Sequence, residues 1–209
     1  MRQDRHHGSW HLSRGDGEAV IRGRRSRLYN FAATHLFRGI YRRLARDIAG
    51  FAPDGGHVLD VGTGPGVLLA ELARIRPDLR LTGVDPSADM VDAARRNCAQ
   101  YGERIVALEG DAARLPLDDR SADVVVSSFS LHHWDDPAAA APELARVLRP
   151  GGRVVIYDFR TAPFDALIDG AWARSVLGAE PAQREELRIG FPLFTRSVRL
   201  TMMHAGAPS

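Results

Sequence analysis

Apolar residues follow two different spacings along the chain. From Arg27 to Ala49 they recur at steps of three and four, which predicts an amphipathic helix that ends at Gly50. Short and nearly continuous apolar runs then alternate with helical patterns. Strands are predicted at 57–61, 80–84, 105–109, 122–127 and 153–159, and helices at 67–76, 87–101 and 137–148. This alternation indicates an α/β fold with a mostly parallel central sheet and helices on both faces.

The two ends of the chain carry weaker patterns. Residues 1–26 are polar and without periodicity, which predicts a flexible N-terminal arm ahead of one domain over 27–209. After residue 159 a helix is expected at 164–177 and the start of another at 181–187. Residues 195–205 fit a short helix or a strand.

Composition narrows the class of protein. The 209 residues suffice for one α/β domain, and no run of about 18 apolar residues indicates a membrane span. The N-terminus lacks the apolar segment of a secretory signal. The single cysteine, Cys98, excludes an internal disulfide and fits a reducing cytoplasm; we interpret it as a packing residue rather than a nucleophile.

All 28 basic residues are arginines, and their distribution is uneven. The first 50 residues hold 11 Arg and 4 acidic residues, whereas the rest hold 17 Arg and 22 acidic residues. This bias fits either the codon usage of a GC-rich genome or contact with nucleic acid. His6, His7 and His11 lie in the arm without an acidic or Cys partner at ligand spacing, so no metal site is predicted.

A glycine-rich turn joins the first predicted strand to the helix after it. Gly62, Gly64 and Gly66 let a ligand approach the backbone, and their spacing is GxGxG rather than the GxGxxG of dinucleotide binding. Pro65 removes an amide that a phosphate would use, and Asp60 would repel a phosphate and attract an ammonium group. The turn therefore favours a cationic amino-acid ligand, with a structural role for Asp60 as the alternative.

Two further acidic residues follow the next strands. Asp85 ends the second predicted strand, where a carboxylate accepts the hydrogen bonds of a ribose diol. Asp111 follows the third strand and suits an exocyclic amine, as in adenine. Each has a simpler alternative, a turn residue for Asp85 and an Asx turn for Asp111.

Four segments in this order resemble class I S-adenosylmethionine-dependent methyltransferases, in the small-molecule branch similar to ubiquinone and menaquinone biosynthesis enzymes. They are VLDVGTGPG (58–66), GVDPSADM (83–90), GDAARLPLDDRSADVVVSSFSLHHWDDP (110–137) and RVLRPGGRVVIYDF (146–159). The resemblance implies a Rossmann-like fold, S-adenosylmethionine as cofactor and a small-molecule methyl acceptor. It also implies a set of cofactor-binding residues: Tyr29, Asp60, Gly62, Thr63, Gly64, Gly66, Asp85, Pro86, Met90, Asp111, Ala112, Ser128 and Phe129.

The C-terminal segment departs from that family pattern. Family members finish with an antiparallel strand pair after a helix that ends in Ala-Gly-aromatic, and His204-Ala205-Gly206 resembles that helix end only three residues before Ser209. We therefore expect a truncated closing pair and a sheet of about five strands with an exposed apolar edge. A partner subunit such as a homo-oligomer, low stability or an inactive product would follow.

Two adjacent histidines follow the fourth strand, where the acceptor is expected. An imidazole suits proton removal from a nucleophile at neutral pH, and adjacent side chains point in different directions. We predict His133 as the base, with His132 packing or capping the next helix, and a structural role for both as the alternative. The competing functions are a non-catalytic cofactor-binding module, a nucleic-acid methyltransferase and an NAD-dependent oxidoreductase, whose Tyr-x-x-x-Lys pair is excluded because the chain has no Lys.

Overall fold

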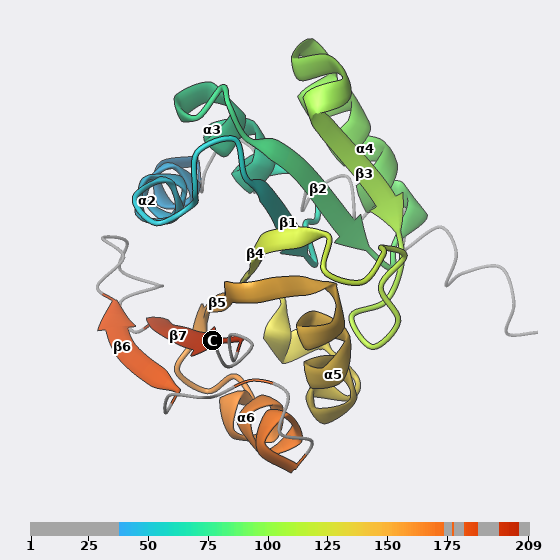
Figure 1. Ribbon diagram of the computed structural model, residues 1–209. Helices are drawn as coiled ribbons and strands as arrows, with labels where there is room; N and C mark the ends of the chain where they lie inside the picture. The colour runs from blue at the N-terminus through green and yellow to red at the C-terminus, as the bar shows by residue number, and fades with distance from the viewer. Residues whose placement is uncertain (1–37, 174–176, 178–181, 188–196, 205–209) are drawn as a thin grey trace, which may run out of the picture.

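Seven strands make up the central sheet of the computed structural model, which describes residues 38–173, 177, 182–187 and 197–204 (Figure 1). They are β1 (His57–Val61), β2 (Arg80–Asp85), β3 (Ile105–Glu109), β4 (Ala122–Ser128), β5 (Leu148–Phe159), β6 (Gln183–Leu187) and β7 (Ser197–Met203). Their order is β3-β2-β1-β4-β5-β7-β6. Strands β1 to β5 pair in parallel, and β7 runs antiparallel to both β5 and β6. The predicted α/β fold with a mostly parallel sheet is confirmed.

Helices cover both faces of this sheet. They are α2 (Arg38–Ala49), α3 (Val67–Ile75), α4 (Ala88–Cys98), α5 (Pro137–Val147) and α6 (Phe164–Ala173), with 3-10 helices η1 (Ala99–Arg104) and η2 (Leu131–His133). Helices α2 and α3 pack together on one face and α4 lies beside α3, whereas α5 and α6 pack together on the other face. The helix expected to reach residue 101 ends as α-helix at Cys98 and continues as η1.

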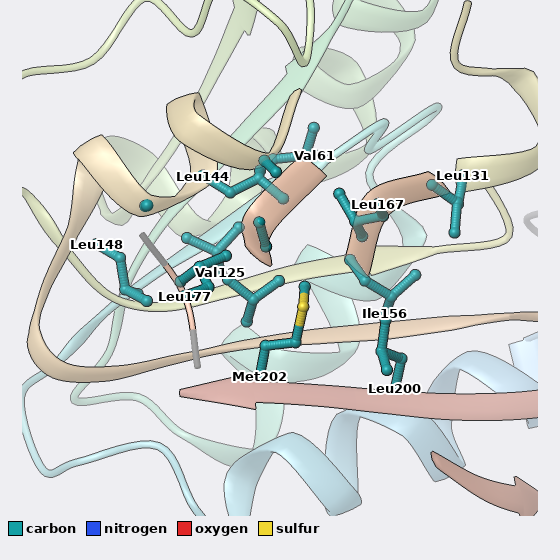
Figure 2. Close-up of a cluster of buried hydrophobic side chains, with 14 of the residues drawn as sticks. Val61, Val125, Leu131, Leu144, Leu148, Ile156, Leu167, Leu177, Leu200 and Met202 are labelled. Carbon is teal, nitrogen blue, oxygen red and sulfur yellow. The ribbon is translucent and has the colours of Figure 1, made fainter. Parts of the chain in front are cut away.

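The continuous apolar runs are explained by burial of the strands on both faces. In β4, Val124 and Val126 face the core beneath α2 and α3, whereas Val125 faces the core beneath α5 and α6. Figure 2 shows this second core, where Val125 lies with Leu144 of α5 and Leu167 of α6. A parallel strand covered on both faces has no polar side to show in its sequence.

The C-terminal expectations are wrong in two respects. The helix start expected at 181–187 is wrong for the described part of that segment, because Gln183–Leu187 forms the edge strand β6. The closing strand pair is present rather than truncated, and the sheet has seven strands instead of about five. Of the two alternatives for 195–205, the strand is right: Val198, Leu200 and Met202 alternate into the core with α6, so β7 covers the apolar edge of β5.

Several sequence expectations fall on residues outside the described ranges. They include the arm over 1–26, Tyr29, the N-terminal part of the helix expected from Arg27 and the chain end after His204. Among the described residues, no helix is long and apolar enough to cross a bilayer.

Candidate functional site

The turn between β1 and α3 has the backbone that only glycine adopts readily. The φ angles of Gly62, Gly64 and Gly66 are 74°, 53° and 74°. Gly66 is the N-cap of α3, and a Cβ there would lie 3.1 Å from Cys98 Sγ, so this glycine allows α4 to pack closely. Cys98 is buried, and burial raises its pKa to about 11, as expected of a packing residue.

The loop after β4 packs directly onto this turn. A Cβ on Gly62 would lie 1.7 Å from Ser130 Oγ, which no side chain tolerates. Ser130 Oγ accepts a hydrogen bond of 2.9 Å from Trp134 Nε1. The Gly62 position therefore sets how closely the two loops approach.

Asp85 ties the glycine turn to the end of β2. Its Oδ2 accepts from the Gly64 amide at 2.8 Å, and its Oδ1 accepts from the Ser87 amide at 3.0 Å. The residue is only 8% exposed, and burial raises its pKa in spite of these two amides. Each carboxylate oxygen accepts more than one hydrogen bond, so Asp85 keeps acceptor capacity for a ligand.

Asp60 lies behind the glycine turn with no solvent exposure. Its Oδ2 accepts from Thr63 Oγ1 at 2.8 Å, whereas its Oδ1 has no hydrogen-bond partner among the described residues. Burial raises the pKa of Asp60 to about 7, and the charge of Asp85 adds to the rise.

A cavity of about 640 Å³ lies at the carboxyl ends of β1, β2 and β4. Nine of the predicted residues line it: Gly62, Gly64, Asp85, Pro86, Met90, Asp111, Ala112, Phe129 and His133. Four others, Asp60, Thr63, Gly66 and Ser128, lie near it but outside its lining. The sequence prediction missed Val61, Gly110, Ala113, Ser130, Trp134, Asp135 and Asp136, although Ala113, Ser130 and Trp134 directly follow predicted residues.

The charge of the cavity wall is acidic. Among the described lining residues, Asp85, Asp111, Asp135 and Asp136 are carboxylates, and no arginine is present. Asp111 Oδ1 also accepts from the Ala113 amide at 2.7 Å, so this residue forms an Asx-type turn and borders the cavity at the same time. This wall favours a cationic ligand over a diphosphate.

Phe129 carries backbone strain at the cavity wall. Its φ is 53°, an uncommon value for a bulky residue, and its amide donates to the Tyr157 carbonyl at 2.8 Å. Its ring centroid lies 6.3 Å from that of Tyr41 and 5.4 Å from that of Phe159. The left-handed backbone at Phe129 places its ring beside those of Tyr41 and Phe159 at the cavity.

The two histidines have different surroundings. His133 lines the cavity, and its pKa is lowered, first by burial and then by the neighbouring His132. His132 does not cap α5, because Asp136 Oδ1 accepts from the Ala139 amide at 3.0 Å in that place. His132 packs instead, with its Nδ1 2.8 Å from Oδ1 of the buried Asp158. Sequence reasoning missed Asp158, whose one signal is an acidic residue directly after the apolar run 154–157.

Comparisons with known proteins find similarity to methyltransferases. A family profile described as a methyltransferase domain matches residues 59–156. A demethylmenaquinone methyltransferase of Roseiflexus castenholzii is 38% identical over 138 residues, which are 62% of this chain and 57% of the relative. A ubiquinone/menaquinone biosynthesis C-methyltransferase of Geotalea daltonii is 35% identical over 142 residues, 65% of this chain and 60% of the relative. The chain thus spans little more than half the length of these two relatives.

Solved structures show the same fold at low identity. A SAM-dependent methyltransferase of Aquifex aeolicus superposes with a TM-score of 0.66 at 17% identity, covering 88% of this chain and 98% of that chain. The [4+2]-cyclase SpnF superposes with a TM-score of 0.67 at 20% identity, covering 79% of this chain and 82% of that chain. Likeness at this level concerns the fold, and the second structure shows that the same fold carries another reaction.

The sheet order, the glycine turn and the profile match make this chain similar to the class I S-adenosylmethionine-dependent methyltransferase domains. Its sequence is similar to that of ubiquinone and menaquinone methyltransferases, as the sequence motifs predicted.

Proposed function

We propose that this chain transfers a methyl group from S-adenosylmethionine to an O, C or N nucleophile of a small-molecule acceptor. The observation that carries the proposal is a single cavity with the glycine turn and Asp85 on one wall and His133 on another. The acceptor class is supported by the curated relatives, which are described as methyltransferases of quinone precursors.

The residues present fit this cofactor. The positive-φ glycines Gly62 and Gly64 remove side chains from the cavity floor, and the acidic wall suits a ligand that carries a sulfonium and an ammonium group. We assign the ribose hydroxyls to Asp85 and the adenine edge to Asp111. Pro86 and Met90 border the adenine, and Ala112 lies beside it. Asp60 and Thr63 act from behind the turn on the amino-acid part. When bound, S-adenosylmethionine would supply a methyl group to an aligned nucleophile, with S-adenosylhomocysteine as the leaving group.

His133 supplies the proton chemistry where the acceptor loses a proton. Because its pKa is lowered, its imidazole is unprotonated at neutral pH and ready to accept. The Phe129 ring forms part of the same wall and limits how the acceptor lies. Alignment of the two reactants contributes the larger share of the rate, on the order of 7–11 kcal/mol in well-oriented systems.

The first test is calorimetric titration of the protein with S-adenosylhomocysteine, with NAD as comparison. We expect saturable binding of the first ligand only. The Asp85→Asn variant should weaken it by about tenfold or more, because a hydrogen bond to a charged acceptor is lost. Asp118→Asn, which changes an exposed carboxylate outside the cavity lining, is the matched control.

The second test is a screen of quinols, phenols and small carboxylates with labelled S-adenosylmethionine. Transfer of label to one of these acceptors supports the proposal. Failure to bind S-adenosylhomocysteine contradicts it. Binding without transfer would instead indicate a cofactor-binding module, and transfer to RNA would indicate a nucleic-acid methyltransferase.

A further inference from the structure

Asp158 is a buried carboxylate that joins β5 to the loop containing the two histidines. It has no solvent exposure and lies one residue before the end of β5. Its Oδ1 lies 2.8 Å from His132 Nδ1 and accepts from the Phe159 amide at 2.7 Å, and its Oδ2 accepts from the His132 amide at 3.2 Å. Burying a carboxylate costs free energy unless its oxygens accept hydrogen bonds. For Asp158 these hydrogen bonds come both from β5 and from the loop that contains His132.

These contacts fix the orientation of the His132 ring. With Asp158 as acceptor, Nδ1 of His132 carries a proton and the ring cannot turn over without losing the contact. The ring centroid lies 5.2 Å from that of Phe159 and 4.0 Å from that of His133, with the two imidazole planes inclined at 43°. His132 therefore contacts the residue that lines the cavity, although it does not line the cavity itself.

We propose that Asp158 and His132 are positioning residues for His133: the carboxylate holds the His132 ring, and that ring holds the His133 imidazole against the cavity. The inference rests on the proposed function, in which His133 accepts the proton of the acceptor. It explains why a carboxylate occupies a buried position near the end of β5 that an apolar residue could fill.

The pair also sets the electrostatics of His133, and its two members act with opposite sign. After burial, the neighbouring His132 lowers the pKa of His133, whereas Asp158 raises it. Removing the imidazole of His132 should therefore raise the pKa of His133, and neutralising Asp158 should lower it. The other charged groups of the described cavity wall are Asp85, Asp111, Asp135 and Asp136, and both variants leave them in place.

The test is an NMR titration of the histidine rings in the full chain, which needs no acceptor and no turnover. The variants are Asp158→Asn and His132→Asn. The side-chain amide of Asn keeps a hydrogen-bond donor for Asp158. The resonance of His133 is assigned from its loss in His133→Gln. His57 serves as an internal control, because its ring contacts Ser121 and Thr82 at the start of β1, far along the strand from the cavity.

We expect the His133 midpoint to rise in His132→Asn and to fall in Asp158→Asn, with the His57 midpoint unchanged. In turnover on an identified acceptor, each variant should lower kcat by about tenfold or more, because small misplacements of a reacting group are costly. Binding of S-adenosylhomocysteine should stay within about twofold of the unsubstituted protein.

The inference is contradicted if the titration midpoint of His133 is unchanged in both variants, or if it shifts in the same direction in both. Asp158 would then be a structural link only. This outcome is distinct from failure of the proposed function, which would show as no binding of S-adenosylhomocysteine or no methyl transfer.

Discussion

Thr63 donates a hydrogen bond of 2.8 Å to Asp60, a carboxylate without solvent exposure. The bond compensates one oxygen only, since Oδ1 has no partner among the described residues. The effect of burial is therefore larger than that of the hydrogen bond, and it raises the pKa of Asp60 from 3.8 to about 7. Ionised Asp60 is therefore costly in the ligand-free protein, and a cationic group beside it would favour the ionised form.

Asp60→Asn is expected to stabilise the ligand-free protein in a pH-dependent way. Between about pH 4 and pH 7 the native state keeps a proton that the unfolded chain has lost, so the contribution of Asp60 to stability falls as pH rises through this window. The gain from Asn should be near zero at about pH 4 and reach up to about 4 kcal/mol above pH 7. Urea unfolding at several pH values measures it. A difference between variant and parent that does not change with pH would show that Asp60 does not titrate as stated.

The same substitution should weaken S-adenosylmethionine binding at neutral pH, because Asn offers no charge to the cofactor. Stability and affinity would then change in opposite directions, which a general loss of structure does not produce. Asp118→Asn is the control, since it removes an exposed carboxylate outside the cavity lining.

The sequence predicted the first five strands because burial on both faces leaves continuous apolar runs such as Val124–Val126. It failed at β6 (Gln183–Leu187), where four of the five residues are polar and exposed and several are strong helix formers. Pairing with β7 overrides that preference, and pairing is a long-range effect. In β7 the alternation of Val198 and Leu200 was visible, but a run of seven residues is too short to distinguish from a helix by spacing alone.

The candidate site divides in a similar way. The glycine turn and Asp85 were predictable, because they follow directly from local spacing at strand ends. Asp158 was missed because its partner His132 lies 26 residues away, and only the parallel pairing of β4 with β5 brings the two together. Contacts between neighbouring strand ends depend on sheet order, which local patterns do not encode.

Gly62→Ala is expected to destabilise the protein and abolish measurable cofactor binding. The change combines a φ of 74° with a Cβ placed 1.7 Å from Ser130 Oγ, so the loop after β4 must move. Gly55→Ala is a matched control: its φ is 66°, and a Cβ there meets nothing within 4 Å. The control should lower the free energy of unfolding by about 1–2 kcal/mol, which is the strain of a left-handed backbone. Gly62→Ala should lower it clearly more. Equal losses of stability in the two variants would show that the contact with Ser130 does not contribute to the effect of Gly62→Ala.

His133→Ala is expected to lower kcat by about a hundredfold on an acceptor whose nucleophile must lose a proton. Because the pKa of His133 is lowered from 6.5, the rate of the unsubstituted protein should fall only on the acidic side of that value. The fall of the rate at acidic pH should be absent in the variant. Calorimetry should show unchanged binding of S-adenosylhomocysteine. Unaltered turnover on the true acceptor would remove His133 from the mechanism.

Tyr157→Phe tests how the closing strands are attached to the rest of the domain. The buried Tyr157 hydroxyl donates to Asp47 Oδ2 at 2.7 Å, and Arg199 Nη1 donates to both oxygens of Asp47 at 2.9 and 2.8 Å. This network links α2, β5 and β7. Loss of the hydroxyl should cost about 1 kcal/mol in urea unfolding, whereas Tyr101→Phe on η1, the control, should cost less. Combination with Asp47→Ala should then add less than the sum of the single changes, since both remove the hydrogen bond between Tyr157 and Asp47. Full additivity would mean that the Tyr157 hydroxyl and Asp47 contribute to stability independently of each other.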